Sequence, residues 1–261
     1  MLRNLKNGRN QFGPISSDSE TDISVLEQFL RFPLWNTNAV FGFFETINGA
    51  IFRGNPDNPK ERFLFIEGHK QKKVVLVAHA DTVWDRAYGY GEVVHQVIRE
   101  DNSFTSTCVG LGADDRAGCA MLWLLKESGH SILITDGEER GAIGSRWLMD
   151  EHKDLASKLN SEHQFMIQLD RRNGQDFKCY DVGNDEFREF IASNTGYSEP
   201  NRSSLTDICT LCQDICGVNF SVGYYNEHSS AEFLNIYEWV NTLKVVKSLI
   251  SMELPRFERS I

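Results

Sequence analysis

The stretch KVVLVAHADTV, residues 73–83, places a run of five apolar residues directly before a histidine and an aspartate. A continuous apolar run of this length is typical of a strand that is buried on both faces of a parallel sheet. His79 and Asp81 stand two positions apart and therefore point to the same side of an extended chain. The stretch predicts a central sheet strand with two neighbouring polar side chains at its end.

Strands and helices alternate along much of the chain. This alternation predicts an α/β fold with three layers, α/β/α, around a mostly parallel mixed central sheet. Because there is no internal repeat and no linker, we expect one domain over residues 1–261, with the polar residues 1–22 as a loop or extension. We expect helices at 24–32, 118–128, 142–152, 204–216 and 231–252, strands within 38–54 (turning at Asn48-Gly49) and at 62–68, 131–135, 164–169 and 219–225, and a hairpin within 92–108 that turns near Asp101-Asn102.

The composition excludes several classes of partner. The net charge is -10, with 27 basic against 37 acidic side chains and no basic cluster, which argues against nucleic acid and anionic membranes. No apolar run approaches the roughly 18 residues of a membrane span, and the polar N-terminus has no secretory signal. We therefore expect a cytoplasmic protein whose six cysteines are reduced thiols. The spacing of Cys209, Cys212 and Cys216 predicts one buried helical face rather than a metal site.

Potential metal ligands follow each apolar strand. Because ligands of open α/β sheets bind beyond the carboxyl ends of the strands, these side chains should gather at one edge. Imidazole and carboxylate ligands suit zinc, and also cobalt or manganese. The inventory therefore predicts two divalent ions, with zinc favoured. The side chains are His79 and Asp81, the pair Glu138-Glu139, Asp170, His228, and the pair Asp114-Asp115 ahead of the helix at 118.

A two-metal site needs a carboxylate that bridges ions about 3.5–4 Å apart. Asp114 is the natural bridge; His79 with Asp170 would hold one ion, and Glu139 with His228 the other. Two further carboxylates remain. Asp81 would accept the second ring N–H of His79, and Glu138 would act as general base on the attacking water. Each piece alone has an ordinary structural explanation, such as helix capping for the Asp-Asp pair. The prediction depends on their joint occurrence.

The motifs HADTV, GLGADDRAGCAML, DGEERGAIGS, LDRRNG and EHSSAEF, in this order, resemble the di-zinc exopeptidase superfamily, which includes zinc aminopeptidases, peptidase T and carboxypeptidase relatives. The resemblance spans roughly residues 74–252. It implies the same five metal ligands, Asp81 as the orienting aspartate, Glu138 as the base, and a cis peptide bond between Asp114 and Asp115. Asp114 follows His79 by 35 positions and His228 follows Asp170 by 58, so neither gap holds the second domain of many relatives.

The sequence favours an aminopeptidase that cleaves short peptides. A carboxypeptidase or an N-acyl amino acid deacylase is the alternative, because the same metals and base cleave any amide. Acidic residues near the metals would favour a free amine, whereas Arg171, Arg172 or Arg202 nearby would favour a carboxylate. A third reading, from another class, is an inactive relative that serves as a binding or scaffold module. Side-chain preference, physiological metal and oligomeric state stay open.

Overall fold

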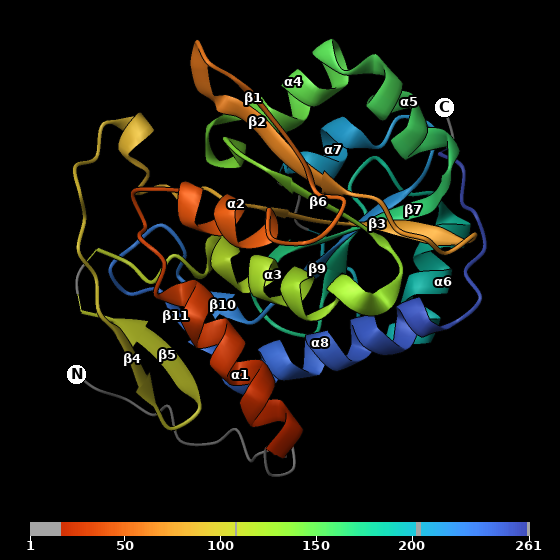
Figure 1. Cartoon of the computed structure of the whole chain (residues 1–261). Coiled ribbons are helices and arrows are strands. Elements are labelled where there is room, and N and C mark those ends of the chain that lie inside the picture. Colours follow the sequence, from red (N-terminus) through yellow and green to blue (C-terminus); the bar gives the residue numbers. More distant parts are fainter. Residues whose placement is uncertain (1–16, 108, 202–204, 260–261) are drawn as a thin grey trace.

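A seven-stranded sheet runs through the centre of the molecule in the order β1-β2-β6-β3-β7-β9-β8 (Figure 1). The computed structural model describes residues 17–107, 109–201 and 205–259. The strands of this sheet are β1 (Ile51–Asn55), β2 (Asn58–Ile66), β3 (Lys73–His79), β6 (Ser131–Thr135), β7 (His163–Arg171), β8 (Phe177–Lys178) and β9 (Gly217–Ser221).

The centre of the sheet is parallel and its margins are antiparallel. β3 pairs in parallel with β6 and β7, and β7 pairs in parallel with β9. β1, β2 and β8 run antiparallel to their neighbours. In the register of β3 and β6, His79 lies opposite Thr135, so both strands end at the same edge. The predicted α/β fold with a mostly parallel mixed sheet is confirmed.

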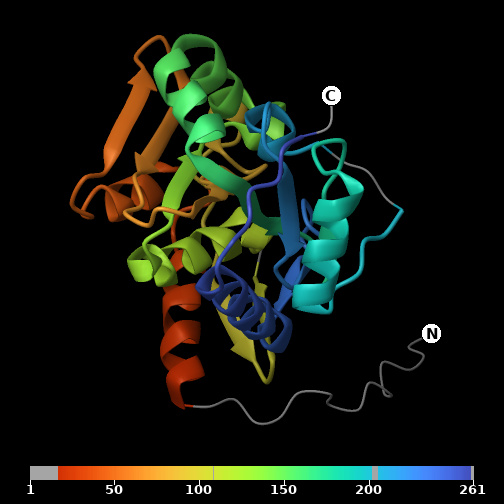
Figure 2. The same ribbon diagram turned by 90° about the vertical axis from the view of Figure 1, so that its right-hand side faces the viewer.

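The alternating side chains of β3 reach two separate cores. Val74, Leu76 and Ala78 pack with α1, α2, α3, α6 and α8 on one face, and Val75 and Val77 pack with α4, α5 and α7 on the other. Each fully buried valine or leucine side chain contributes about 1.5–3 kcal/mol. Figure 1 shows these two helical layers, and Figure 2 shows α6 and α8 side by side. The helices are α1 (Ser17–Leu30), α2 (Asn38–Phe44), α3 (Ala113–Leu124), α4 (Ile143–Glu151), α5 (Lys153–Ser161), α6 (Asp185–Thr195), α7 (Asp207–Leu211) and α8 (Ile236–Ser251).

A second, antiparallel sheet has the order β10-β11-β5-β4. It contains the predicted hairpin, which turns at residues 101–102 between β4 (Val97–Glu100) and β5 (Ser103–Ser106). Its other two strands are β10 (Tyr224–Tyr225) and β11 (Phe233–Asn235). The loop between β10 and β11 carries His228 to the edge of the large sheet. Three 3-10 helices, Arg86–Tyr88, Lys126–Ser128 and Glu138–Arg140, complete the elements of the described residues.

Several predicted elements differ from the structure near the N-terminus. Residues 38–44 form helix α2, not a strand, because Val40, Phe41 and Phe44 are buried together at helical spacing. α1 begins at Ser17, so residues 17–22 of the predicted loop are helical, whereas residues 1–16 lie outside the described part. β-branched and aromatic residues favour strands locally, and tertiary packing overrides that preference here.

The C-terminal third also differs from the prediction. The helix predicted at 204–216 covers only Asp207–Leu211, because the side chain of Asn160 binds the main-chain N–H groups that follow and the chain then enters β9. Cys209, Cys212 and Cys216 therefore share no helical face. The strand predicted at 219–225 is interrupted after β9, and residues 233–235 of the predicted last helix form β11. Helices α5 and α6 were not predicted.

None of the described helices combines the length and the apolar character needed to cross a membrane. The five described cysteines are free thiols, as expected for reduced residues.

Candidate metal centre

Five predicted ligands meet at the carboxyl edge of the large sheet. His79 ends β3, Asp170 stands near the end of β7, and Asp114 opens α3. Glu139 lies in the 3-10 helix after β6, and His228 lies in the loop after β10, with a left-handed φ of 63°. Because the parallel strands end side by side, residues distant in the sequence become neighbours here.

Asp114 stands between the two histidines. Its Oδ1 lies 3.2 Å from Nε2 of His79, and its Oδ2 lies 3.1 Å from Nε2 of His228. The same nitrogen of His79 lies 3.3 Å from Oδ1 of Asp170, and that of His228 lies 3.0 Å from Oε2 of Glu139. The side chains thus form two sets of three possible ligands, His79-Asp114-Asp170 and Asp114-Glu139-His228, which share one carboxylate.

The donor atoms fit divalent ions. Four nitrogen and oxygen ligands about 2.0–2.1 Å from a tetrahedral zinc ion stand about 3.3 Å from one another. The distances of 3.0–3.3 Å within the two sets are close to this value. In the described part of the chain, Oε1 of Glu139 is buried without any hydrogen-bond partner. A buried carboxylate oxygen is costly to leave unpaired, and a cation would satisfy it.

The charges at this edge shift the pKa values of the metal-free protein. Burial lowers the pKa of His79, but Asp170, Asp114 and Asp81 outweigh it and raise that pKa well above its ordinary value. Hydrogen bonds to Asp114 and Glu139 raise the pKa of His228 to about 11. Both imidazoles therefore hold an extra proton at neutral pH, and these positive charges stand where divalent ions would otherwise balance the carboxylates.

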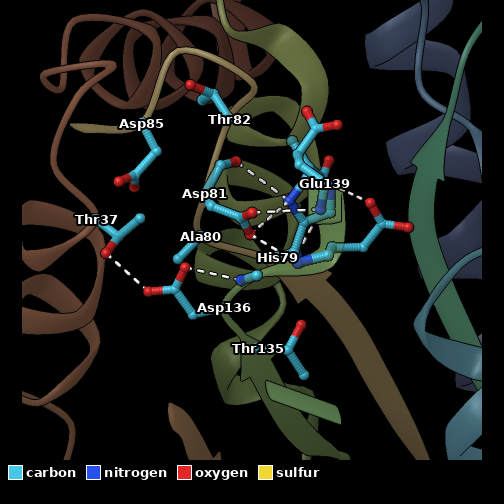
Figure 3. Close-up of polar contacts among 12 residues, drawn as sticks. Thr37, His79, Ala80, Asp81, Thr82, Asp85, Thr135, Asp136 and Glu139 are labelled. Atoms are coloured by element: carbon cyan, nitrogen blue, oxygen red, sulfur yellow. Dashed lines mark hydrogen bonds and ion pairs between the residues drawn. The ribbon is translucent and has the colours of Figure 1, made fainter. Parts of the chain in front are cut away.

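Asp81 contacts His79 as the sequence predicted and also holds the next loop. Its Oδ1 lies 3.3 Å from Nδ1 of His79, whose ring also faces the main-chain oxygen of Asp81 at 3.2 Å. The carboxylate accepts hydrogen bonds from the main-chain N–H groups of Glu138 (3.2 Å) and Glu139 (3.3 Å) and from the hydroxyl of Tyr88 (2.5 Å). Figure 3 shows Asp81 beside His79 and Glu139. One buried side chain therefore orients elements from two strand ends.

Glu138 lies beside the ligands and belongs to neither set. Its Oε2 is 4.0 Å from Nε2 of His79, and its side chain is 14% exposed. Burial raises the pKa of Glu138 well above the ordinary value, and the charges of Asp170 and Asp207 raise it further. An acid with a raised pKa that faces a cavity has the properties required for proton transfer.

The peptide bond between Asp114 and Asp115 is cis, as the resemblance predicted. Asp115 is fully buried, and the sequence indicated no specific role for it. Its carboxylate accepts hydrogen bonds from the main-chain N–H of His79 (3.2 Å) and from that of Gly118 (2.9 Å). The second contact caps the helix. The two aspartates thus have different roles: Asp115 binds main-chain N–H groups, and Asp114 faces the two histidines.

A buried charge cluster behind the site was also missed. Nζ of Lys60 lies 2.7 Å from Asp85 and 2.6 Å from Asp136. Asp136 also accepts a hydrogen bond from the N–H of Gly137 at 2.8 Å, which fixes the turn that leads to Glu138. Figure 3 shows Asp85 and Asp136 on the side of Asp81 away from Glu139. Lys60 comes from β2, far earlier in the sequence, and no motif links it to this loop.

A cavity of about 170 Å³ opens above the ligands. Arg171 and Arg172 line it together with five carboxylates. Arg171 binds Asp176 at 2.6 Å, and Arg172 forms an ion pair with Glu227. Arg202 lies outside the described residues. The carboxylates that line the cavity are those of Asp114, Glu138, Glu139, Asp170 and Glu227.

No protein-family model matches the sequence, and no curated protein matches it either. Solved structures do match. Aminopeptidase PepT from Bacillus cereus is 13% identical with a TM-score of 0.63 (89% of this chain, 98% of that chain), and a tripeptidase from Staphylococcus aureus is 15% identical with 0.61 (92% and 100%). A glutaminyl cyclase from an Acidobacteriales bacterium is 13% identical with 0.58 (94% and 98%). The chain has the fold of these enzymes, as the resemblance predicted, and a shared fold leaves the reaction to be argued from the site.

Proposed function

We propose that this protein is a metal-dependent hydrolase that cleaves amide bonds, and specifically an aminopeptidase that acts on short peptides. The observation that carries the proposal is the pair of ligand sets that share Asp114, with Glu138 free beside them. His79, Asp114 and Asp170 would hold one divalent ion, and Asp114, Glu139 and His228 the second. Zinc is favoured for imidazole and carboxylate ligands, with cobalt and manganese as alternatives.

When bound, the ions would supply Lewis-acid polarisation of the scissile carbonyl and a lowered pKa for the attacking water. Glu138 takes the proton from that water and passes it to the leaving amine. Its position matches this task, because the carboxylate lies beside the ligands, faces the cavity and belongs to neither ligand set. Asp81 fixes the ring of His79, so that Nε2 faces the cavity edge.

The charges that line the cavity favour a free amino group over a free carboxylate. Both arginines that line it are already paired, Arg171 with Asp176 and Arg172 with Glu227, so neither is available to a substrate carboxylate. A carboxypeptidase or an N-acyl amino acid deacylase would need an available cation for the substrate carboxylate, and Arg172 would first have to leave Glu227. The small volume of the cavity suits the end of a short peptide.

The proposal includes a single catalytic domain over residues 1–261 and a cytoplasmic location. Free thiols at all five described cysteines are consistent with a reducing compartment. A scaffold without activity is disfavoured, because binding alone gives no reason for Glu138, a partly buried and otherwise unused carboxylate, to face the cavity.

The test measures metal content and hydrolysis on the same sample. Purified protein is assayed for zinc, cobalt and manganese, and then offered matched dipeptides with free or acetylated amino ends and free or amidated carboxyl ends. Two ions per chain, with chelator-sensitive cleavage only of peptides that have a free amine, are expected. Cleavage that requires a free carboxylate would instead identify a carboxypeptidase or deacylase. No bound ion and no cleavage after metal addition would refute the proposal.

A further inference from the structure

The side chain of Glu232, a buried carboxylate near the site, accepts hydrogen bonds from main-chain N–H groups. Glu232, 3% exposed, accepts four of them. Oε2 binds the N–H groups of Leu111 and Gly112, each at 2.8 Å, and Oε1 binds those of Ala113 at 2.8 Å and Asp114 at 3.3 Å. The carboxylate therefore binds the main chain of four consecutive residues, and the last of them is Asp114, the ligand that the two sets share.

This contact is distinct from ordinary capping of helix α3. The carboxylate of Asp115 already accepts the N–H of Gly118 inside the helix. Glu232 instead binds the two residues before α3 and the first two residues of α3, where Asp114 has non-helical φ and ψ and Gly112 has a left-handed φ of 70°. A Cβ on Gly112 would lie 2.3 Å from a methyl carbon of Leu34. Four hydrogen bonds to a single side chain hold these main-chain groups in place.

Glu232 is also tied to the second histidine. It follows His228 by four positions, and its own N–H donates to the main-chain oxygen of Ser229 at 3.1 Å. The hydroxyl of Ser229 donates to the main-chain oxygen of Asn226 at 2.7 Å, which closes the turn that contains His228. A short, cross-bonded segment therefore joins His228 to the main chain of Asp114.

We propose that Glu232 is a positioning residue for metal binding: it sets Asp114 and His228 at the separation that one ion requires. The inference rests on the proposed two-metal site, and adds a residue that touches neither ion. Second-layer partners of metal ligands typically change metal affinity or activity by about 10- to 100-fold when they are removed. The loss of affinity should be largest for the ion held by Asp114, Glu139 and His228, because the two ligands that Glu232 positions, Asp114 and His228, both belong to that set.

The variants are Glu232→Ala and Glu232→Gln. The alanine removes all four acceptor contacts, whereas the glutamine keeps the size and one acceptor oxygen but turns an NH₂ group towards two of the amides. Asn235→Ala is the matched control. Asn235 lies three positions further on and caps α8 by accepting hydrogen bonds from the N–H groups of Tyr237 (3.0 Å) and Glu238 (3.3 Å), neither of which is a predicted ligand.

Zinc affinity is measured against a chromophoric chelator, and the cobalt-substituted protein is titrated by its visible absorption, which reports ligand geometry independently of turnover. Both Glu232 variants should bind one of the two ions about 10- to 100-fold more weakly. Asn235→Ala should unfold more easily and retain wild-type affinity for both ions. A purely structural Glu232 would produce the pattern of Asn235→Ala.

Wild-type affinity for both ions and an unchanged cobalt spectrum in Glu232→Gln, measured on folded protein, would overturn the inference and leave the proposed function intact. If Glu232→Ala does not fold, the glutamine variant decides the question by itself. A wild-type protein that binds no ion and cleaves no peptide would overturn both proposals together.

Discussion

Replacing Glu138 by glutamine separates the proposed base from the ligands. The side chain belongs to neither ligand set and stands 4.0 Å from Nε2 of His79, so glutamine preserves size and leaves the five ligands unchanged. It cannot take a proton from water. General-base catalysis by a positioned side chain contributes about 100- to 10,000-fold, equivalent to about 2.7–5.4 kcal/mol of barrier. We expect kcat to fall by this factor, whereas both ions stay bound.

Glu139→Gln is the matched comparison, because the two glutamates are adjacent in one 3-10 helix. Oε2 of Glu139 lies 3.0 Å from Nε2 of His228, so this variant should lose affinity for one ion as well as turnover. The assay combines metal content by elemental analysis with steady-state cleavage of a free-amine dipeptide amide, using saturating zinc. Glu138→Gln with more than one tenth of wild-type kcat, or with fewer ions bound than the wild type, would refute the assignment of Glu138.

Three further perturbations follow from the same contacts. Zinc affinity should rise by roughly tenfold per pH unit between pH 6 and 8 for each proton that zinc displaces. The reason is that His79 and His228 have raised pKa values in the metal-free protein and must lose a proton to bind zinc. A zinc affinity that does not change with pH would contradict this. Protonation of His228 also stabilises the metal-free folded protein. This contribution to the free energy of unfolding is fully present below about pH 6.5, the pKa of histidine in the unfolded chain, and should be lost as pH rises through the folded pKa of about 11. Lys60→Met should lower the free energy of unfolding by about 3–5 kcal/mol in urea titrations, because Asp85 and Asp136 lose a buried partner. Arg62 still pairs with Asp136 in this variant, and a loss below about 1 kcal/mol would show that Lys60 is not required to compensate the two aspartates. Gly118→Ala should lower the free energy of unfolding by about 1–3 kcal/mol, since its Cβ would lie 2.0 Å from a carbonyl oxygen of β7. Gly42→Ala, at an exposed position of α2, meets no atom within 4 Å and should be neutral or stabilising; equal effects of the two substitutions would contradict close packing at Gly118.

The parts of the fold that the sequence predicted best are those in which one pattern determines the structure. β3 and β6 are apolar runs between polar ends, β7 has one glutamine within such a run, and a central parallel strand has almost no alternative to that pattern. Residues 38–44 carry the same kinds of residue but form helix α2, because Val40, Phe41 and Phe44 fit a helical stripe as well as a strand. Only packing against the rest of the chain decides between the two, and a local pattern does not contain it.

The same distinction explains the site. Ligands at strand ends are predictable, because sheet topology alone brings His79 and Asp170 to one edge. Residues that position the ligands are less predictable. Their partners are main-chain N–H groups, which every residue type except proline carries, so the sequence does not indicate which of them will be bound. Glu232 is a single acidic letter in EHSSAEF, yet it binds four amides more than a hundred positions earlier. A ligand set can therefore be read from residue types, whereas the precision with which the fold holds that set becomes visible only in three dimensions.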